Sequence, residues 1–474
     1  MNGHVNGTPS QLPDEMFGII EATGQGLAPR LGRLALPGRR VIDTPHYLGN
    51  TSRGVVPHIT QDTFVRDTHI NAVYVALEDF IEKAPRDTPP LYNFRSPDGA
   101  SSLRRFIALP EDTLLVLGTR RTPPVLAPAA NSNTDKTIAI GTSVGFRTLA
   151  AADYADGVEG LGADIVVGLG DIPYGRTPGN KRIEKATDRS IAWLQDHVLL
   201  RKEKEAKHQA KLFASLLPVS CAEQQYYIDK IEELVDDVSG LAIHDTSSLE
   251  GLPEDLWHLP RLGYTEPASP HDILRQVGLG IDIFAVPFIT AATDAGIALD
   301  FSFPSKQEAT SNGREPSALG IDMWLPTHAV DVSPLSAECE CYACTNHHRA
   351  YLQHLLAAKE MLGWVLLQIH NHHVIELVFE GIRSSIAAGT FEDDVTGFSN
   401  VYESSLPEKT GQGPRIRGYQ FKAEGPGEPK KNKAPYSSLN DAKEKLAEAT
   451  PPSRDEAVAG ADGLEAQGFA TKQE

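Results

Sequence analysis

Cys339-Glu340-Cys341-Tyr342-Ala343-Cys344 brings three thiols together within six residues, and only Cys221 of the four cysteines lies outside this run. Three close thiolates and one imidazole are the ligand set of a closed tetrahedral Zn²⁺ site. The spacing lets one loop supply three corners of the tetrahedron, and a histidine on a following helix supplies the fourth. We therefore predict one zinc ion held by Cys339, Cys341, Cys344 and a histidine. Its role is structural, because four protein ligands leave no position open for water.

The fourth ligand is not fixed by spacing alone. The segment after the thiols is rich in histidine, and the candidates are His347, His348, His354, His370, His372 and His373. The alternative interpretation of the thiol run is a set of redox-active or merely buried cysteines.

Composition limits the kinds of protein that this chain can be. It has 474 residues, of which 41% are hydrophobic and 23% charged, with a net charge of −19. This is enough for a large core in one or two domains. So acidic a chain is not expected to bind nucleic acid alone over a broad surface, because phosphate contacts need clustered Lys and Arg. A local basic patch or a basic partner subunit is still compatible with such a role.

The location of the protein is predicted from its cysteines and its apolar runs. The cysteine pattern argues against a disulfide framework and for a reducing compartment. The N-terminus lacks a signal-peptide pattern, and no apolar run approaches the length of a membrane span. We expect a soluble, cytoplasmic protein.

Eight short apolar runs, bounded by Gly, Pro or Asp, predict buried parallel strands. They cover residues 45–50, 72–77, 113–118, 164–170, 211–218, 240–245, 260–265 and 280–287. Helical periodicity is expected between them at 185–207, 221–235 and 269–277, the last with Ser269 as N-cap and Asp272 in the capping-box position. Eight strands with intervening helices predict an α/β fold, the (β/α)8 TIM barrel.

The pattern changes after the eighth strand. We predict a barrel core over residues 15–303, then a zinc-binding subdomain with the last barrel helix over 304–395, with helices at 347–368 and 374–388. Residues 406–474 are polar and are expected to be disordered, apart from a short helix at 440–449. The basic run of Lys430, Lys431 and Lys433 is more typical of a solvated tail than of an RNA-binding patch.

The residues that flank the thiols are more specific than the zinc pattern alone. Arg-Ala-Tyr-Leu at 349–352, Glu-Met-Leu at 360–362 and Ile-His-Asn at 369–371 follow the Cys-x-Cys-x-x-Cys run. With further matching runs at 43–46, 56–60, 211–215, 260–264, 270–274 and 280–284, the chain resembles the tRNA-guanine transglycosylases over residues 15–395. The resemblance implies a (β/α)8 barrel with a zinc subdomain inserted before the last helix. It also implies that His370 is the fourth zinc ligand.

The resemblance also implies a chemistry from which this sequence departs. The family exchanges guanine at the tRNA wobble position for a deazaguanine base, queuine in eukaryotes. A carboxylate nucleophile attacks the ribose C1′, and a second carboxylate acts as general base and acid. The nucleophile position holds Ala285 here, and the third-strand stretch 115–121 carries no carboxylate. The Gly-Gly loop of the base pocket is replaced by residues 243–246, which include His244 and Asp245, and the base-recognising Asp falls at Gly170, beside Asp171.

We therefore expect no catalytic residue and no bound organic cofactor in this chain. The pattern resembles the accessory, non-catalytic subunit of the eukaryotic enzymes of this family. That resemblance implies a heterodimer with a catalytic subunit, contact with tRNA through the complex, and peripheral association with the mitochondrial outer membrane. Two alternatives remain: a scaffold protein that has lost tRNA work, or an active transglycosylase with displaced carboxylates. Asp282, Asp294 and Asp300 are candidates for the latter, although strand-end or loop roles are favoured for all three.

Overall fold

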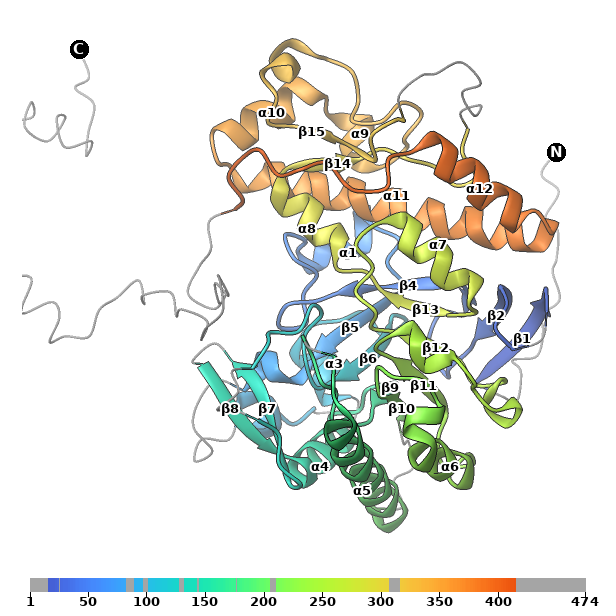
Figure 1. Ribbon diagram of the computed structural model, residues 1–474. Helices are drawn as coiled ribbons and strands as arrows, with labels where there is room; N and C mark the ends of the chain where they lie inside the picture. The colour runs from blue at the N-terminus through green and yellow to red at the C-terminus, as the bar shows by residue number, and fades with distance from the viewer. Residues whose placement is uncertain are drawn as a thin grey trace, which may run out of the picture. The chain divides into compact units, whose positions relative to one another are not determined.

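A closed barrel of eight parallel strands forms the centre of the protein (Figure 1). The computed structural model describes residues 16–414 except 25, 82–88, 97–100, 128–131, 143–144, 176, 205–209 and 307–315. The barrel strands are β4 (His46–Asn50), β5 (Ala72–Ala76), β6 (Leu114–Gly118), β9 (Ile165–Val167), β10 (Lys211–Leu216), β11 (Gly240–Ile243), β12 (Arg261–Gly263) and β13 (Ile283–Ala285). Each lies inside one of the eight expected ranges, so the predicted TIM barrel is confirmed.

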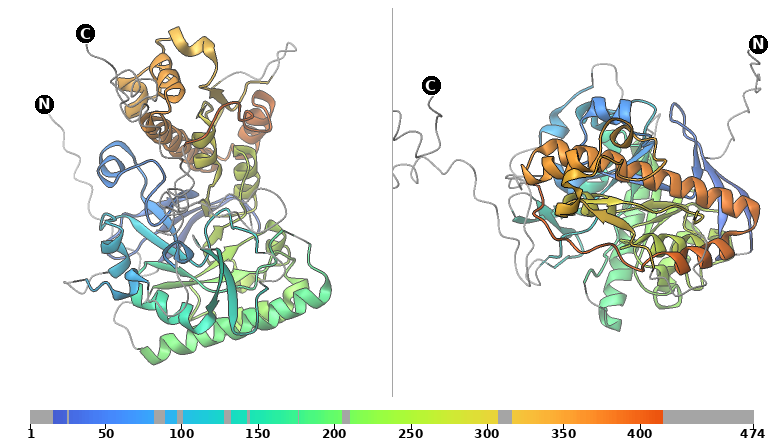
Figure 2. Two further views of the ribbon diagram at one scale, coloured as in Figure 1. Left: turned by 90° about the vertical axis from the view of Figure 1, so that its left-hand side faces the viewer. Right: turned by 90° about the horizontal axis from the view of Figure 1, so that it is seen from above.

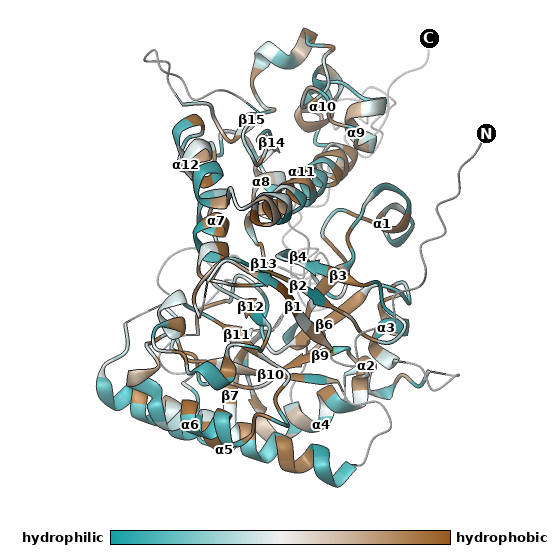
Figure 3. Ribbon diagram, turned by 90° about the vertical axis from the view of Figure 1, so that its right-hand side faces the viewer, coloured by the Kyte–Doolittle hydropathy of each residue, from teal (hydrophilic) through white to brown (hydrophobic). Residues whose placement is uncertain are grey.

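The barrel interior is filled by side chains that alternate along each strand, as the pleat requires. Ile283 and Ala285 of β13 face this interior core, whereas Phe284 between them belongs to the outer core beneath the helices. The strands at the centre of Figure 3 are correspondingly hydrophobic. Buried parallel strands need apolar residues on both faces, which explains why these runs are continuously apolar.

A three-stranded antiparallel sheet, which the sequence analysis did not predict, precedes the barrel. It consists of β1 (Phe17–Ala22), β2 (Arg30–Leu34) and β3 (Ile42–Thr44). Phe17, Leu34 and Ile42 from this sheet join the interior core of the barrel. The sheet is hard to recognise in the sequence because most of β1 faces solvent and β3 has only three residues.

Helices and a hairpin surround the barrel on its outer side. The helices are α1 (Gln61–Asp67), α2 (Pro90–Asn93), α3 (Ser102–Phe106), α4 (Ala151–Leu161), α5 (Asn180–Lys204), α6 (Gln225–Glu233) and α7 (Pro270–Gly278), and the hairpin is β7 (Thr137–Thr142) with β8 (Gly145–Ala150). The expected capping box of α7 is wrong in detail. The Ser269 side chain makes no cap bond, and Asp272 accepts from the backbone N–H of Ala268 instead, at 3.1 Å.

The chain after β13 forms α8 (Phe288–Ala295), β14 (Ile297–Leu299), β15 (Gly320–Asp322), α9 (Tyr342–Asn346), α10 (Arg349–Ala357), α11 (Met361–Ala388) and α12 (Phe391–Val401). The expected helix boundaries at 347–368 and 374–388 are wrong. Lys359 has a φ of 58° and separates α10 from α11, whereas α11 runs without a break through 369–373. The polar run there does not end the helix, because His370, Asn371 and His372 are all buried by neighbouring elements.

Helix α11 takes part in two cores and lies across the barrel beside α8 and β4 (Figures 1 and 2). Its first turns place Trp364, Leu366 and Leu367 in an apolar cluster with Cys341 and Cys344. Its later turns, such as Val378 and Ile382, join the outer core of the barrel. The proposed boundary at residue 303 stays a prediction, as does the disordered tail. Its helix at 440–449 lies outside the described residues.

No helix in the described ranges is both long enough and apolar enough to span a membrane.

Candidate metal centre and barrel mouth

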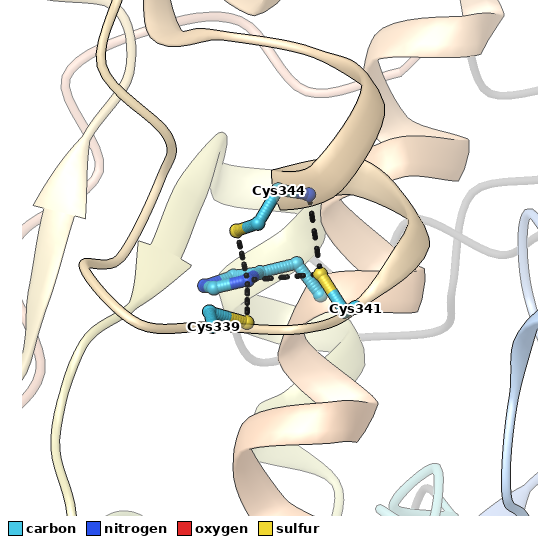
Figure 4. Close-up of side chains that lie close together, drawn as sticks. Cys339, Cys341 and Cys344 are labelled. Atoms are coloured by element: carbon cyan, nitrogen blue, oxygen red, sulfur yellow. Dashed lines mark hydrogen bonds between the residues drawn. The ribbon is translucent and has the colours of Figure 1, made fainter.

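Four side chains converge where α9 meets α11. Cys339, Cys341 and Cys344 come from the loop and the first turns of α9, and His370 comes from the middle of α11. Their ligand atoms all lie within 4.8 Å of one another. Figure 4 shows the three sulfur atoms arranged around a single ring nitrogen, which is Nδ1 of His370. The Sγ atoms of Cys339, Cys341 and Cys344 lie 3.6, 3.6 and 3.4 Å from it, respectively. One N–H can point at only one sulfur well, so this arrangement fits a shared cation better than a hydrogen bond.

These distances match tetrahedral zinc. Zn–S bonds of about 2.3 Å and Zn–N bonds of about 2.0 Å, at tetrahedral angles, place a ligand sulfur about 3.5 Å from the ligand nitrogen. The donor set of three thiolates and one imidazole is also that of structural zinc sites. Since all four corners are protein atoms, such an ion would have no position for a substrate or a reactive water.

The orientation of His370 is set by a hydrogen bond behind the ring. Its Nε2 lies 2.9 Å from the carbonyl oxygen of Leu299, the last residue of β14, so Nε2 carries the proton and the Nδ1 lone pair is left for a metal ion between the sulfurs. A hydrogen bond of this kind is the usual support for a metal-binding histidine. The bond therefore ties the proposed ligand on α11 to the β14 strand.

The hydrogen bonds of Asn371 explain why an asparagine follows the histidine in the Ile-His-Asn run. Its Oδ1 accepts from the backbone N–H of Leu299 at 2.8 Å, and its Nδ2 donates to Ile297 O at 3.0 Å and Thr293 Oγ1 at 2.9 Å. The side chain is fully buried. The sequence shows Asn371 only as part of a motif and does not reveal this positioning role.

The thiol loop also stabilises one of its cysteines in the deprotonated form. Cys341 is the N-cap of α9, and its Sγ accepts from the backbone N–H of Cys344 at 3.4 Å. The thiols of Cys341 and Cys344 hold the pKa of the Cys339 thiol well below its usual range. Deprotonated cysteine is the form that binds zinc.

The other histidine candidates are not members of the cluster, although His373 also hydrogen-bonds with Cys339. His347 stacks on Tyr351, and the His348 side chain caps α10 by accepting from the Tyr351 N–H. His372 contacts the Tyr47 hydroxyl, and His373 lies against His69. His354, on α10, is not part of the cluster either. Among the described residues, the fourth member of the cluster is His370.

The second region of interest is the mouth of the barrel, where the strands end at their carboxyl termini. Enzymes with this fold place their reactive groups at that end. Ala285 ends β13 there, is completely buried and packs in the interior core with Tyr264 and Leu262. Val116 faces inward in the middle of β6, as Leu114 does at its start, while Leu115 and Leu117 face the outer core. These positions present methyl and isopropyl groups.

Aromatic side chains occupy the mouth above these residues. The rings of His244 and Tyr264 stack with their centroids 5.6 Å apart, and Tyr74 lies 5.0 Å from Tyr264. The Arg120 guanidinium lies over the ring of Tyr174, 5.2 Å from its centroid. The cavity that remains between these side chains has a volume of about 50 Å³.

The carboxylates named from the sequence are engaged in structural contacts. Buried Asp282 accepts from Arg30 at 2.9 and 2.5 Å and from the Arg261 backbone N–H at 2.7 Å, before β13 begins. Asp294 accepts from His58 at 2.7 Å, and Asp300 from the Ser336 hydroxyl at 2.6 Å. None of the three lines the cavity.

Asp171 is also removed from the mouth. Gly170 lines the cavity, but the carboxylate of Asp171 is completely buried between Arg182, at 2.6 Å, and Arg189, at 3.0 Å. Burial alone would raise the pKa of Asp171, but hydrogen bonds from Arg182, Asn133 and Arg189 outweigh it and lower the pKa.

One carboxylate does line the cavity, and sequence analysis missed it. Glu266 lies three residues beyond β12, and partial burial raises its pKa. Its φ of 52° is in the left-handed region, which is unusual for a residue with a Cβ and recurs at functional sites. In the sequence, the feature that could have pointed to Glu266 is the Glu-Pro dipeptide that it begins.

An eight-stranded parallel barrel with a Cys3His cluster beside its last long helix defines a class of barrel proteins with a zinc-type centre. Residues 25–404 match the queuine tRNA-ribosyltransferase family, and this match covers most of the chain. The chain therefore belongs to the queuine tRNA-ribosyltransferase family.

Curated relatives carry a more specific name. The chain is 36% identical over 411 residues to the queuine tRNA-ribosyltransferase accessory subunit 2 of Schizosaccharomyces pombe, covering 86% of this chain and 89% of that protein. Relatives with the same name from Ixodes scapularis and Danio rerio are 28% and 25% identical, over 75% and 80% of this chain and 93% and 96% of their own lengths.

Proposed function

We propose that this chain is the non-catalytic accessory subunit of a eukaryotic queuine tRNA-ribosyltransferase. It pairs as a heterodimer with a catalytic barrel of the same family. In that complex it supports the exchange of guanine for queuine at the wobble position of tRNAs with GUN anticodons. The observation that carries the proposal is the mouth of the barrel, where buried Ala285 stands at the end of β13 and aromatic rings fill the space above it.

The chemistry of the mouth supports a non-catalytic role. Covalent exchange at a ribose carbon needs a nucleophile, and a methyl group is not one. A general base must also reach the base being exchanged, but the β6 positions carry aliphatic side chains, and the next residues include the cationic Arg120 and Arg121. The relatives are named accessory subunits, which supports the same assignment.

We propose a structural zinc ion in the Cys339, Cys341, Cys344 and His370 cluster. A bound zinc ion would supply folding energy by linking the loop before α9 to α11, since structural zinc couples metal binding to folding. The residues themselves orient the site: Cys341 caps α9, and Leu299 holds the His370 ring. The proposed role of the cluster is to maintain this part of the subunit.

The alternative function is an active transglycosylase that uses a displaced carboxylate. The one specific observation in its favour is that Glu266 lines the cavity. An exchange assay with labelled guanine and tRNA separates the two functions. This chain alone should incorporate no label, whereas its mixture with the catalytic subunit should incorporate more than the catalytic subunit alone. Exchange by this chain alone that is lost in Glu266→Gln would overturn the proposal in favour of the alternative.

The third hypothesis is that the chain is a scaffold protein with no role in tRNA modification, and it predicts no contact with RNA. Ultraviolet crosslinking of tRNA to the assembled complex tests it. We expect crosslinks to both chains, and crosslinks confined to the catalytic chain would favour the scaffold. The cytoplasmic location and the peripheral association with the mitochondrial outer membrane stay predictions, which cell fractionation checks.

A further inference from the structure

The chain after α12 returns across β15 and the end of α8 as a strap of residues 405–413, the red segment in Figure 1. It has no regular secondary structure. The family match ends at residue 404, so the strap lies just beyond the part of the chain that this match covers. Membership of the family therefore does not explain why the strap is there.

The strap lies on the ring of Trp324, which other contacts hold in place. The indole Nε1 donates to the carbonyl oxygen of Ala295 at 3.0 Å, and the backbone N–H of Trp324 donates to Oδ1 of Asp322 at 3.0 Å. Gly296 lies against the ring, because a Cβ there would be 2.2 Å from Nε1. We call Trp324, Asp322 and Gly296 the Trp324 site. None of these contacts involves the strap, so the site is preformed.

Two neighbouring residues of the strap fit this site closely. Thr410 Oγ1 donates to the second carboxylate oxygen of Asp322, Oδ2, at 2.5 Å. Gly411 lies so close to the ring that a Cβ there would be 2.1 Å from Cδ2 and 2.2 Å from Cε2 of Trp324. The φ angle of Gly411 is not in the left-handed region. The space beside the ring, and not the backbone conformation, therefore requires a glycine at this position.

The rest of the strap is weakly held. Between residues 405 and 413, no backbone group hydrogen-bonds to the backbone of any described residue. Glu408, Lys409 and Gln412 are exposed, and Leu406 is only partly buried against the core. Segments with few buried contacts and exposed backbone open locally at a small cost in free energy. The strap is therefore expected to leave the Trp324 site while the rest of the protein stays folded.

We propose that the Trp324 site is a peptide-binding site and that the strap is its releasable ligand from the same chain. The site takes an extended peptide in which a hydroxyl residue precedes a glycine. The carboxylate of Asp322 accepts the hydroxyl, and the ring of Trp324 leaves room for glycine alone. When the strap is released, a peptide of this kind from another chain can bind in its place. This binding does not depend on tRNA or on the accessory role.

Limited trypsin digestion of the full-length chain measures release. Cleavage after Lys409 requires the strap to leave the site, so its rate follows the population of the released state. Gly411→Ala places a methyl group against the ring and should speed this cleavage at least about tenfold. Gly397→Ala, at a glycine of α12 whose added Cβ meets open space, is the matched control and should leave the rate unchanged. Each rate is divided by that of the free peptide with the same sequence.

Two further variants and a stability measurement separate release from unfolding. Thr410→Val removes the hydroxyl that Asp322 accepts and should speed cleavage several-fold, whereas Thr410→Ser keeps the hydroxyl and should not. Urea denaturation should show nearly the same midpoint for Gly411→Ala and the wild type, because the strap opens by itself. Unchanged cleavage in Gly411→Ala, or cleavage that rises only in step with global unfolding, would overturn the proposal.

A peptide with the sequence of residues 404–414 tests the binding site itself. A tethered segment has an effective concentration of about 1 mM, so binding in trans is followed by NMR in that range. The peptide should bind the full-length Gly411→Ala chain, whose own strap is displaced, more tightly than the wild type. The same peptide with Gly411→Ala should not bind either chain. Equal binding of the two peptides, or no binding to the Gly411→Ala chain, would overturn the proposal.

Discussion

At the scale of single residues, the metal cluster depends on its four proposed ligands and also on residues that do not contact the metal position. The carbonyl oxygen of Leu299 accepts a hydrogen bond from the His370 ring, while Asn371 hydrogen-bonds to the backbone of the same strand. The four proposed ligands were predicted from thiol spacing and family resemblance. These supporting contacts were not, because they join residues about seventy positions apart, a relation that no local pattern encodes.

Replacing Cys341 by Ser should remove zinc and loosen the segment around α9. Serine at that position can no longer supply a thiolate, and structural zinc contributes to folding. We expect metal content, measured by plasma mass spectrometry, to fall well below one zinc per chain, with faster amide exchange at 339–346. Cys221→Ser is the matched control, since Cys221 is buried elsewhere and should leave the zinc content unchanged. Full zinc in the Cys341→Ser protein would refute the ligand assignment.

Replacing Asn371 by Ala should destabilise the protein by about 2–4 kcal/mol, because three buried hydrogen bonds are lost and the Leu299 N–H is left without a partner. Chemical denaturation measures the change. Asn346→Ala, at an exposed position of α9, removes a similar amide and should cost less than about 1 kcal/mol. Equal costs for the two variants would show that Asn371 does not have the positioning role assigned to it.

At the scale of elements, helix α11 packs polar as well as apolar groups against the barrel. Burial lowers the pKa of His372 to about 3, and burial together with Arg383 lowers the pKa of His46 to about 3. Glu376 is only 8% exposed, and its Oε2 atom has no partner within the described chain. Burial raises the pKa of Glu376 to about 7, although Arg383 opposes the shift. The sequence does not reveal this inner face, because its polar residues give no clean helical stripe.

The raised pKa of Glu376 makes stability depend on pH. Between its ordinary pKa of 4.5 and about 7, the unfolded chain has released this proton while the folded chain retains it. The folded state then binds more protons, so its stability falls as pH rises through this window. Relative to the wild type, Glu376→Gln should therefore gain about 1–3 kcal/mol in unfolding free energy between pH 4.5 and 7.5.

Urea denaturation at a series of pH values measures this gain. Glu184→Gln, on the exposed face of α5, serves as the control and should differ from the wild type by a constant amount. A difference between Glu376→Gln and the wild type that stays flat with pH would contradict the assigned protonation.

At the scale of the whole molecule, the barrel was predictable because buried parallel strands are short, apolar and bounded by turn residues. The N-terminal sheet was missed, since an exposed strand such as β1 lacks that signature. The helix break at Lys359 was also missed, because a left-handed lysine leaves no sequence signal. The side chains that occupy the barrel mouth were only partly predicted from the sequence. His244 was expected there, but Tyr74 comes from β5 and Tyr174 from the segment between β9 and α5, and they meet it only in the folded barrel.

The proposed accessory role means that this chain takes part in tRNA modification without performing the covalent step. The most direct test incubates tRNA with this chain, with the catalytic subunit, and with both, and then looks for a denaturation-resistant protein–RNA adduct. Mass spectrometry of the adduct identifies which chain carries the RNA. We predict an adduct on the catalytic subunit in both samples that contain it, and none on this chain. A covalent adduct on this chain, formed in the absence of the other subunit, would contradict the proposed non-catalytic role.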